Sequence, residues 1–179
     1  MQANLIIPQE CYELIRSKLC PLDDPNEQFG FALAGTSTHT GGCNILLRKF
    51  IYADNSCLIH QSGAAVKPDP RFVKYIWRIA KLSNSSLVDF HTHPFAGRNV
   101  CFSGIDDRSE RESFPKAVKY LGKGPHASVV LGKDSLDARW FNTQTATIEP
   151  IAAVKILGQT LAVVTPTSAR LKRSLQNVS

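Results

Sequence analysis

The sequence lacks the features that define several other classes of protein. It has no apolar run approaching the roughly 20 residues that span a bilayer. The first residues, Met1 to Asn4, contain no basic segment leading into a long apolar one. The five cysteines are odd in number, widely spaced and never arranged as CxxC, so the sequence predicts neither a disulfide framework nor a structural zinc knot. We therefore expect a cytoplasmic protein without a membrane span.

The composition predicts one folded domain. A chain of 179 residues, 43% hydrophobic and 20% charged, can bury a sizeable core and is neither disordered nor fibrous. The formal net charge of +6 favours acidic partners, either nucleic acid or an acidic protein, although such an excess often serves only solubility. We expect the domain to cover residues 1–158. Residues 159–179 carry Arg170, Lys172 and Arg173 but no acidic residue, and we expect a basic tail that is mobile or ordered by a partner.

Hydrophobic periodicity and turn residues predict alternating helices and strands of the α/β class. The helices are expected at Pro8–Cys20, Asp69–Leu82, Ser103–Glu112 and Pro115–Leu121. The strands are expected at Phe29–Ala34, Ile45–Tyr52, Ser86–Phe90, Val129–Leu131, Leu136–Phe141 and Thr147–Val154, the first two forming a hairpin with its turn at Thr36–Gly42.

The strand at Ser86–Phe90 leads into His91-Thr92-His93-Pro94. Residues two apart in a strand point to the same face, so both imidazoles can converge on one ion. Pro94 ends the strand just beyond them. Two histidines in a strand are also often ordinary polar residues, and the pair alone leaves both interpretations open.

Ser103-Gly104-Ile105-Asp106 adds a carboxylate at the start of a helix. Two histidines and one aspartate are the ligands that an open catalytic zinc site needs, with water in the fourth position. Ser103 and Asp106 also match a capping box, which would simply start the helix, and both roles can hold together. Asp107 is the nearest competitor for the ligand role, but the register favours Asp106. The mixed charges that follow, through Glu112, predict a solvated helix face.

Glu27 is the candidate proton acceptor. Zinc lowers the pKa of a water molecule from ~15.7 to about 7, so a nearby carboxylate can take its proton and pass it to a leaving amine. Glu27 lies just before the strand that begins at Phe29, where Gly30 and Gly35 permit close backbone approach. Taken alone, it would be a solvated loop residue.

Together these residues resemble the JAMM metalloproteases of the JAB/MPN family, whose pattern is an upstream glutamate, then HxHP, then SxxD. The resemblance implies that His91, His93 and Asp106 bind Zn²⁺, that Glu27 is the general acid/base, and that Ser103 steadies the tetrahedral oxyanion. It also implies a JAB/MPN fold, a mixed β-sheet packed by helices and related to that of cytidine deaminases, over residues 1–158. The stretch from His93 to Ser103 is two residues longer than is most common in the family, which affects the shape of that loop.

By this resemblance the chain is expected to hydrolyse peptide or isopeptide bonds at the C-terminus of a ubiquitin-like protein. Its compact form is similar to the stand-alone bacterial members, which accompany activating-like and conjugating-like enzymes. One alternative is a non-catalytic MPN-type scaffold that binds protein partners, although such modules typically lack the ligands. Another is a nucleic-acid enzyme or binder, but the deaminase signature of HxE with a later PCxxC is absent.

Overall fold

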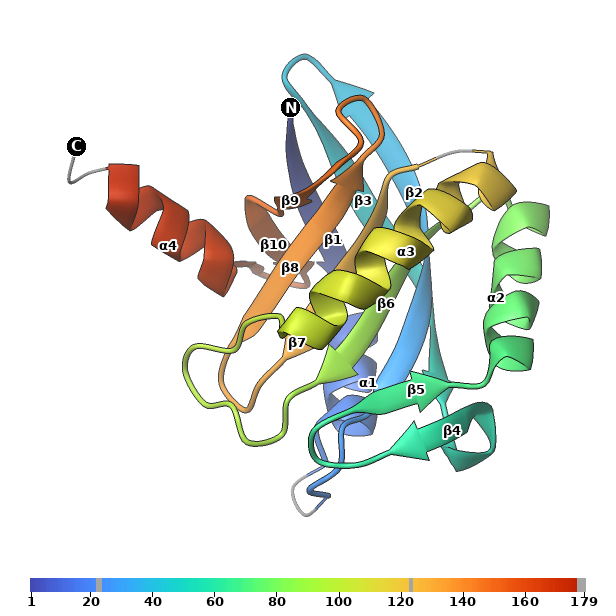
Figure 1. The fold of residues 1–179 in the computed structure, drawn as a ribbon. Coiled ribbons are helices and arrows are strands. Elements are labelled where there is room, and N and C mark those ends of the chain that lie inside the picture. The colour runs from blue at the N-terminus through green and yellow to red at the C-terminus, as the bar shows by residue number, and fades with distance from the viewer. Residues whose placement is uncertain (22–23, 123, 177–179) are drawn as a thin grey trace.

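A computed structural model describes residues 1–21, 24–122 and 124–176. The described chain forms a large curled mixed β-sheet packed by helices, which confirms the α/β class (Figure 1). The sheet has nine strands in the order β11-β10-β1-β3-β2-β6-β7-β8-β9. Their bounds are β1 (Gln2–Pro8), β2 (Phe29–His39), β3 (Gly42–Ala53), β6 (Ser86–Thr92), β7 (His126–Leu131), β8 (Leu136–Asn142), β9 (Thr147–Pro150), β10 (Ala153–Leu157) and β11 (Leu161–Val164). Strand β1 pairs in parallel with β3 and β10, and β6 with β7, while the other pairs are antiparallel.

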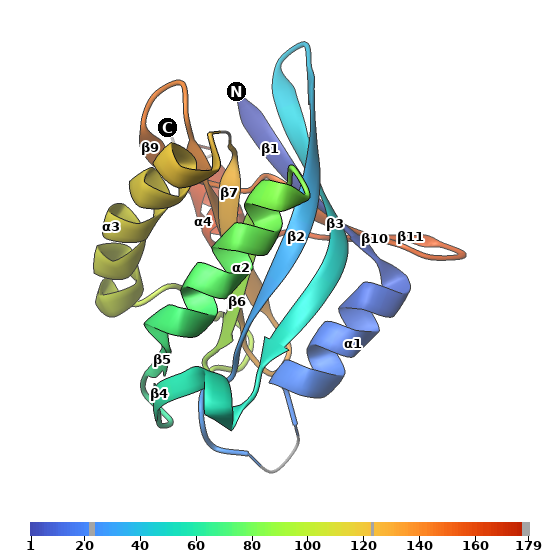
Figure 2. The same ribbon diagram turned by 90° about the vertical axis from the view of Figure 1, so that its right-hand side faces the viewer.

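Helices cover both faces of the sheet. Figure 2 shows α1 (Gln9–Leu19) on one face and α2 (Pro70–Leu82) with α3 (Gly104–Leu121) on the other. On the α1 face, Ile15 and Leu19 join a buried cluster with Val88 and Phe90. A second cluster, under α2 and α3, contains Phe31, Leu33, Ile76, Ala80, Leu87 and Leu121. Because side chains alternate along β6, the residues that share a face with Leu87 point toward α2 and α3.

The helices at Gln9–Leu19 and Pro70–Leu82 confirm two predictions of the sequence. The backbone N–H of Arg71 donates to the Asp69 side chain, which caps α2 as expected. The β2–β3 hairpin is also confirmed, but its strands extend through Thr36–His39, so the turn is shorter than predicted. Gly41 lies in this turn with φ of 91°, a conformation that glycine adopts without steric cost.

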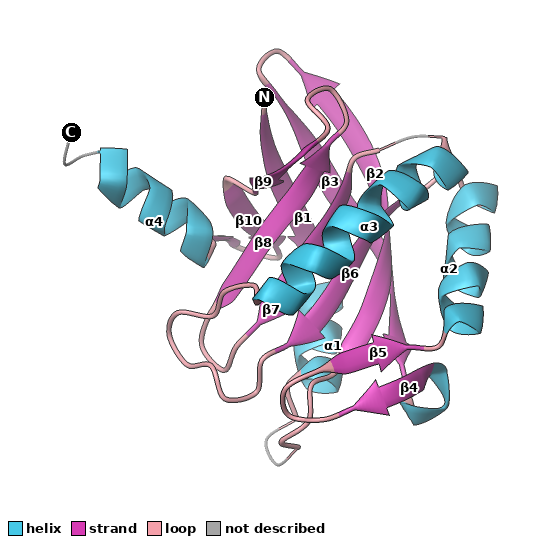
Figure 3. Cartoon of the chain, in the orientation of Figure 1, coloured by secondary structure: helices cyan, strands magenta, loops and turns pink. Residues whose placement is uncertain are grey.

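Two other boundaries were predicted wrongly. Pro115 does not divide two helical pieces but lies inside the continuous helix α3 (Figure 3). Burial of Phe114, Ala117 and Leu121 along one side stabilises α3 across the proline. The expected strand Thr147–Val154 is two strands, β9 and β10, because the chain changes its partner strand between them. The Ile151 N–H still donates to the Ala138 carbonyl of β8, whereas the next N–H, that of Ala152, donates to the Ala3 carbonyl of β1.

Residues 159–179, expected from the sequence to be a tail, are largely built into the fold. Residues 161–164 form β11 and pair with β10, so position 158 falls within a hairpin. Thr167–Gln176 form α4, which packs against β8. The Ser168 hydroxyl donates to Asp137 Oδ1 over 2.7 Å and anchors the start of α4. These contacts correct the prediction for residues 161–176, while residues 177–179 lie outside the described chain.

The remaining elements are a short 3₁₀ helix (Asn55–Cys57) and the two-stranded sheet of β4 (Leu58–Gln61) and β5 (Val66–Pro68), which lies beside the end of β6 (Figure 1). Among the helices of the described chain, none combines the length and apolar character needed to cross a lipid bilayer.

Candidate metal centre

The end of strand β6 positions two imidazoles. The strand is held on one side by β2 and on the other by β7, and the backbone N–H of His93 extends this pairing by donating to the Leu131 carbonyl over 2.9 Å. His91 and His93 lie two residues apart on one face, with ring centroids separated by 5.1 Å. The two imidazoles therefore face α3 from a rigid, central strand.

The start of α3 positions Asp106. Ser103 is the N-cap, and its backbone N–H and hydroxyl donate to Asp106 Oδ2 over 2.6 Å and 2.7 Å. The backbone N–H of Asp106 donates in return to the Ser103 hydroxyl over 3.3 Å, which completes a capping box. Both roles predicted for this motif therefore coexist, because the cap that starts the helix also holds the Asp106 carboxylate toward the histidines.

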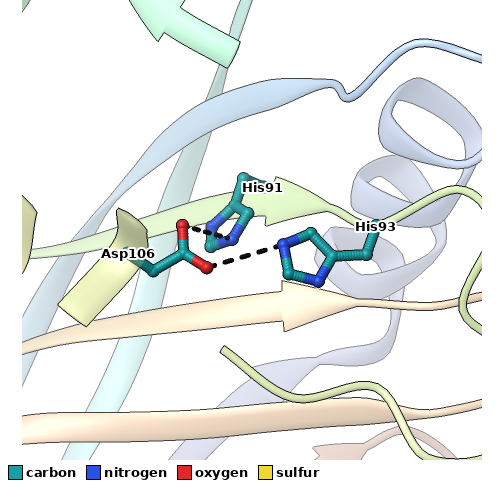
Figure 4. Close-up of side chains that lie close together, drawn as sticks. All are labelled: His91, His93 and Asp106. Atoms are coloured by element: carbon teal, nitrogen blue, oxygen red, sulfur yellow. Dashed lines mark ion pairs between the residues drawn. The ribbon is translucent and has the colours of Figure 1, made fainter. Parts of the chain in front are cut away.

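The three side chains converge (Figure 4). Asp106 Oδ1 lies 3.3 Å from His91 Nε2, and Asp106 Oδ2 lies 3.5 Å from His93 Nε2. One ligand atom from each residue lies within 4.8 Å of the other two.

These separations suit a metal better than hydrogen bonds. Charge-assisted N–H···O bonds are typically about 2.7–2.9 Å long, whereas zinc bonds of about 2.0–2.1 Å place tetrahedral ligands about 3.3–3.4 Å apart. Moreover, His91 Nε2 is buried and makes no hydrogen bond with any part of the chain that the structure describes. The group His91, His93 and Asp106 can therefore hold a metal ion.

Glu27 lies next to this group. Its backbone N–H donates to the Ser62 carbonyl over 2.8 Å, and Gln61 Nε2 donates to its carbonyl over 2.9 Å. The segment after β4 thus holds Glu27 in place just before β2. The side chain is buried, and Glu27 Oε1 lies 3.8 Å from His93 Nε2. The structure therefore brings together all five residues singled out from the sequence: Glu27, His91, His93, Ser103 and Asp106.

Burial and mutual charge shift the pKa values in this group. Burial raises the pKa of Glu27 above its usual value, although His91 and His93 oppose the shift. Burial would also raise the pKa of Asp106, but the two imidazoles and the Ser103 N–H outweigh it and hold the pKa of Asp106 well below its usual range. Asp106, and then Glu27, raise the pKa of His93. Asp106, which stays ionised, suits the role of a metal ligand, and Glu27, which binds a proton more readily, suits the role of a proton carrier.

Sequence reasoning missed a second polar group, which lies deeper on the same face of the sheet. Asp89, Ser128 and Arg139 occupy paired positions on β6, β7 and β8. The Ser128 hydroxyl donates to Asp89 Oδ1 over 2.5 Å. On α3, Glu110 is buried with its Oε2 2.5 Å from Arg139 Nε, and Asp107 contacts Arg139 Nη1.

This second group corrects the prediction of a solvated helix face at Glu110, which is buried, while Arg108, Arg111 and Glu112 are exposed as predicted. Burial raises the pKa of Asp89 to about 6 and the pKa of Glu110 to about 8. Asp107 points to Arg139 and not to the imidazoles, so it does not join the candidate metal ligands. The signal that could have found Asp89 is its spacing of two from His91, which places it on the same face.

The remaining candidates are not members of the converging group. Cys101 is exposed, and all five cysteines are free thiols. His39 and His60 are exposed, while His126 is buried and accepts a hydrogen bond from the Leu87 N–H over 3.0 Å.

Comparison with known proteins gives a likeness of fold alone. No family model matches the chain, and no curated protein matches it. Among solved structures, the chain is similar to the solution structure of protein DSY2949 from Desulfitobacterium hafniense, with 15% sequence identity and a TM-score of 0.53. The match covers 87% of this chain and 95% of that one. The chain thus shares with that protein an α/β fold in which helices pack on a large mixed sheet.

Proposed function

We propose that the chain is a zinc-dependent hydrolase of the JAMM type with a JAB/MPN fold. The observation that carries the proposal is the convergence of His91, His93 and Asp106 beside the buried carboxyl group of Glu27. The order of elements supports it, since the glutamate precedes β2, the histidines end the central strand β6, and the aspartate starts α3.

The chemistry follows from the position of each group. A zinc ion held by His91, His93 and Asp106 would act as a Lewis acid toward a substrate carbonyl and lower the pKa of a water molecule. Glu27 is placed to accept a proton from the attacking water and to deliver it to the leaving amine, and its raised pKa suits a group that must carry a proton in both directions. Ser103 orients Asp106 through its hydroxyl and backbone N–H. By the JAMM resemblance, the hydroxyl would turn its one hydrogen from Asp106 to the developing oxyanion during the reaction.

The loop that is longer than usual in the family leaves the ligands undisturbed. Between His93 and Ser103 it is fastened to the β7–β8 turn, where Lys133 N–H donates to the Ala96 carbonyl over 2.9 Å and Val100 N–H to the Ser135 hydroxyl over 3.0 Å. The additional residues therefore extend along that turn, while Asp106 still reaches both histidines.

The substrate that we propose is the C-terminal tail of a ubiquitin-like protein, joined by a peptide or isopeptide bond. An extended tail can add to a strand edge by main-chain hydrogen bonds, and the β4–β5 sheet flanks Glu27. Activating-like and conjugating-like enzymes would be partners in a cytoplasmic pathway of this kind. These assignments rest on the JAMM resemblance.

The test is cleavage of a ubiquitin-like protein carrying a C-terminal fusion, by the wild type and by Glu27→Gln, each analysed for zinc. Loss of the proton carrier should lower the cleavage rate by roughly 10²- to 10⁴-fold while zinc is retained. Glu112→Gln, which makes the same change at an exposed position of α3, should cleave normally. A wild type with neither zinc nor cleavage would instead support the non-catalytic scaffold.

A further inference from the structure

A cavity of about 250 Å³ extends from the candidate metal centre into the space between the sheet, α2 and α3. Glu27, His91 and Asp106 form one end of it. Its walls are mostly apolar and include Phe29, Phe31, Val73, Trp77, Leu87 and Phe114. The volume is below the roughly 300–1,000 Å³ of drug-sized ligand pockets, and it suits a single side chain.

The cavity also contains two carboxyl groups. Asp89 lies on the sheet two residues before His91, which places it roughly 7 Å along the strand from the metal centre. Asp89 is only partly buried although it occupies a central strand, because it faces the cavity. Glu110 lines the cavity from α3, and its Oε2 lies 2.5 Å from Arg139 Nε.

The charges of the cavity do not balance. Arg139 is the cation in contact with Glu110, and it is shared with Asp107, which lies outside the cavity. Glu110 is paired with Arg139, whereas Asp89 accepts a hydrogen bond from Ser128 and makes no ion pair among the described residues, so the cavity presents one carboxyl group that is not ion-paired. A buried carboxylate without a cation is costly. A ligand that brings a positive charge removes this cost, whereas an anion increases it.

We infer that this cavity is a specificity pocket for a lysine or arginine side chain of the substrate. The aliphatic stem would lie against the apolar walls and Trp77, and the ammonium or guanidinium group would reach Asp89 and Glu110. The scissile carbonyl would then lie at His91, His93 and Asp106. The identity of the ligand as a substrate residue rests on the proposed hydrolase function, but the preference of the pocket for a cation does not.

Simple ligands test the pocket separately from catalysis. Pentylamine and pentan-1-ol have the same apolar stem, but only the amine is positively charged at neutral pH. Each is titrated by calorimetry and NMR into the protein in EDTA, so that the amine cannot bind a metal. Pentylamine should bind more tightly than the alcohol and shift the resonances of residues that line the cavity. Equal binding of the two, or no binding of the amine, would overturn the inference.

Asp89→Asn removes the charge and keeps an oxygen that can accept from Ser128. It should weaken pentylamine binding by roughly ten- to a hundredfold and leave pentan-1-ol unchanged. Glu112→Gln, which removes one charge from the exposed side of α3, should bind the amine as the wild type does. An Asp89→Asn protein with unchanged amine affinity would overturn the inference that Asp89 receives the cation. Should that variant not fold, Ala117→Leu provides the test, since it fills the cavity without touching a carboxyl group and should abolish amine binding.

Cleavage then links the pocket to the reaction. Fusion substrates with lysine or norleucine next to the scissile bond differ only in charge at the end of the side chain. The lysine substrate should be cleaved with the lower KM, and Asp89→Asn should remove that preference. Amine binding without any cleavage would refute the hydrolase and leave the pocket standing. Cleavage without amine binding or lysine preference would refute the pocket and leave the hydrolase standing.

Discussion

Substituting Ser103 separates the two tasks that the structure gives to one hydroxyl group. The Ser103 hydroxyl caps α3 by accepting from the Asp106 N–H and orients the Asp106 carboxylate by donating to Oδ2. Loss of an N-cap in Ser→Ala costs about 1 kcal/mol of stability, whereas Gly in the same position costs only a few tenths. Loss of a group that orients a metal ligand typically weakens metal binding about 10- to 100-fold.

Ser103→Ala should therefore lower both the free energy of unfolding and the zinc affinity. Ser103→Gly should lower the zinc affinity by a similar factor with little loss of stability, and Ser103→Thr should preserve both. Stability is measured by urea unfolding in EDTA, and zinc affinity by competition with a fluorescent chelator. If Ser103→Gly binds zinc as tightly as the wild type, the hydroxyl does not orient Asp106, and the reasoning about the capping box fails.

Two further predictions concern the fold. Because burial raises the pKa of Asp89 to about 6 and of Glu110 to about 8, the folded chain holds these protons more tightly than the unfolded chain. The free energy of unfolding of the metal-free protein should therefore fall as pH rises from about 5 to about 8, and Asp89→Asn should flatten this decline below about pH 6. Urea unfolding at a series of pH values measures both effects. A free energy of unfolding that rises over this range would contradict the pKa shifts. Ile15→Ala, at a position 1% exposed on α1, should lower the free energy of unfolding by about 2–5 kcal/mol. Leu14→Ala, at the neighbouring position that is 44% exposed, should change it by less than about 0.5 kcal/mol. Equal losses would refute the assigned buried face of α1.

The convergence of His91, His93 and Asp106 could be predicted because each part of the group depends on local rules. Strand periodicity places His91 and His93 on one face, and the capping box fixes Asp106 in the first turn of α3. These rules act over a few residues, so the sequence carries them directly. Glu27 could be named as a candidate from the chemistry, but local rules could not place it, because its approach to His93 depends on the pairing of β2 with β6, more than sixty residues away in the chain.

The elements that escaped prediction are defined by long-range contacts. Strand β1 is inserted between β3 and β10, and β11 pairs with β10, so neither can be identified without knowing its neighbours. The polar row of Asp89, Ser128 and Arg139 spans three strands and is visible only once their register is known. For the same reason the buried side of α3, with Glu110, cannot be separated from its solvated side by charge pattern alone.

The most direct test of the account is the zinc content of two variants at adjacent positions. The wild type should bind one zinc ion per chain, measured by calorimetry and elemental analysis. Asp106→Asn should lose most of this affinity, because Asp106 lies 3.3 Å from His91 Nε2 and 3.5 Å from His93 Nε2. Asp107→Asn should retain it, because Asp107 contacts Arg139 instead. A wild type that binds no zinc, or an Asp106→Asn protein that binds it as well as Asp107→Asn does, would contradict the metal centre.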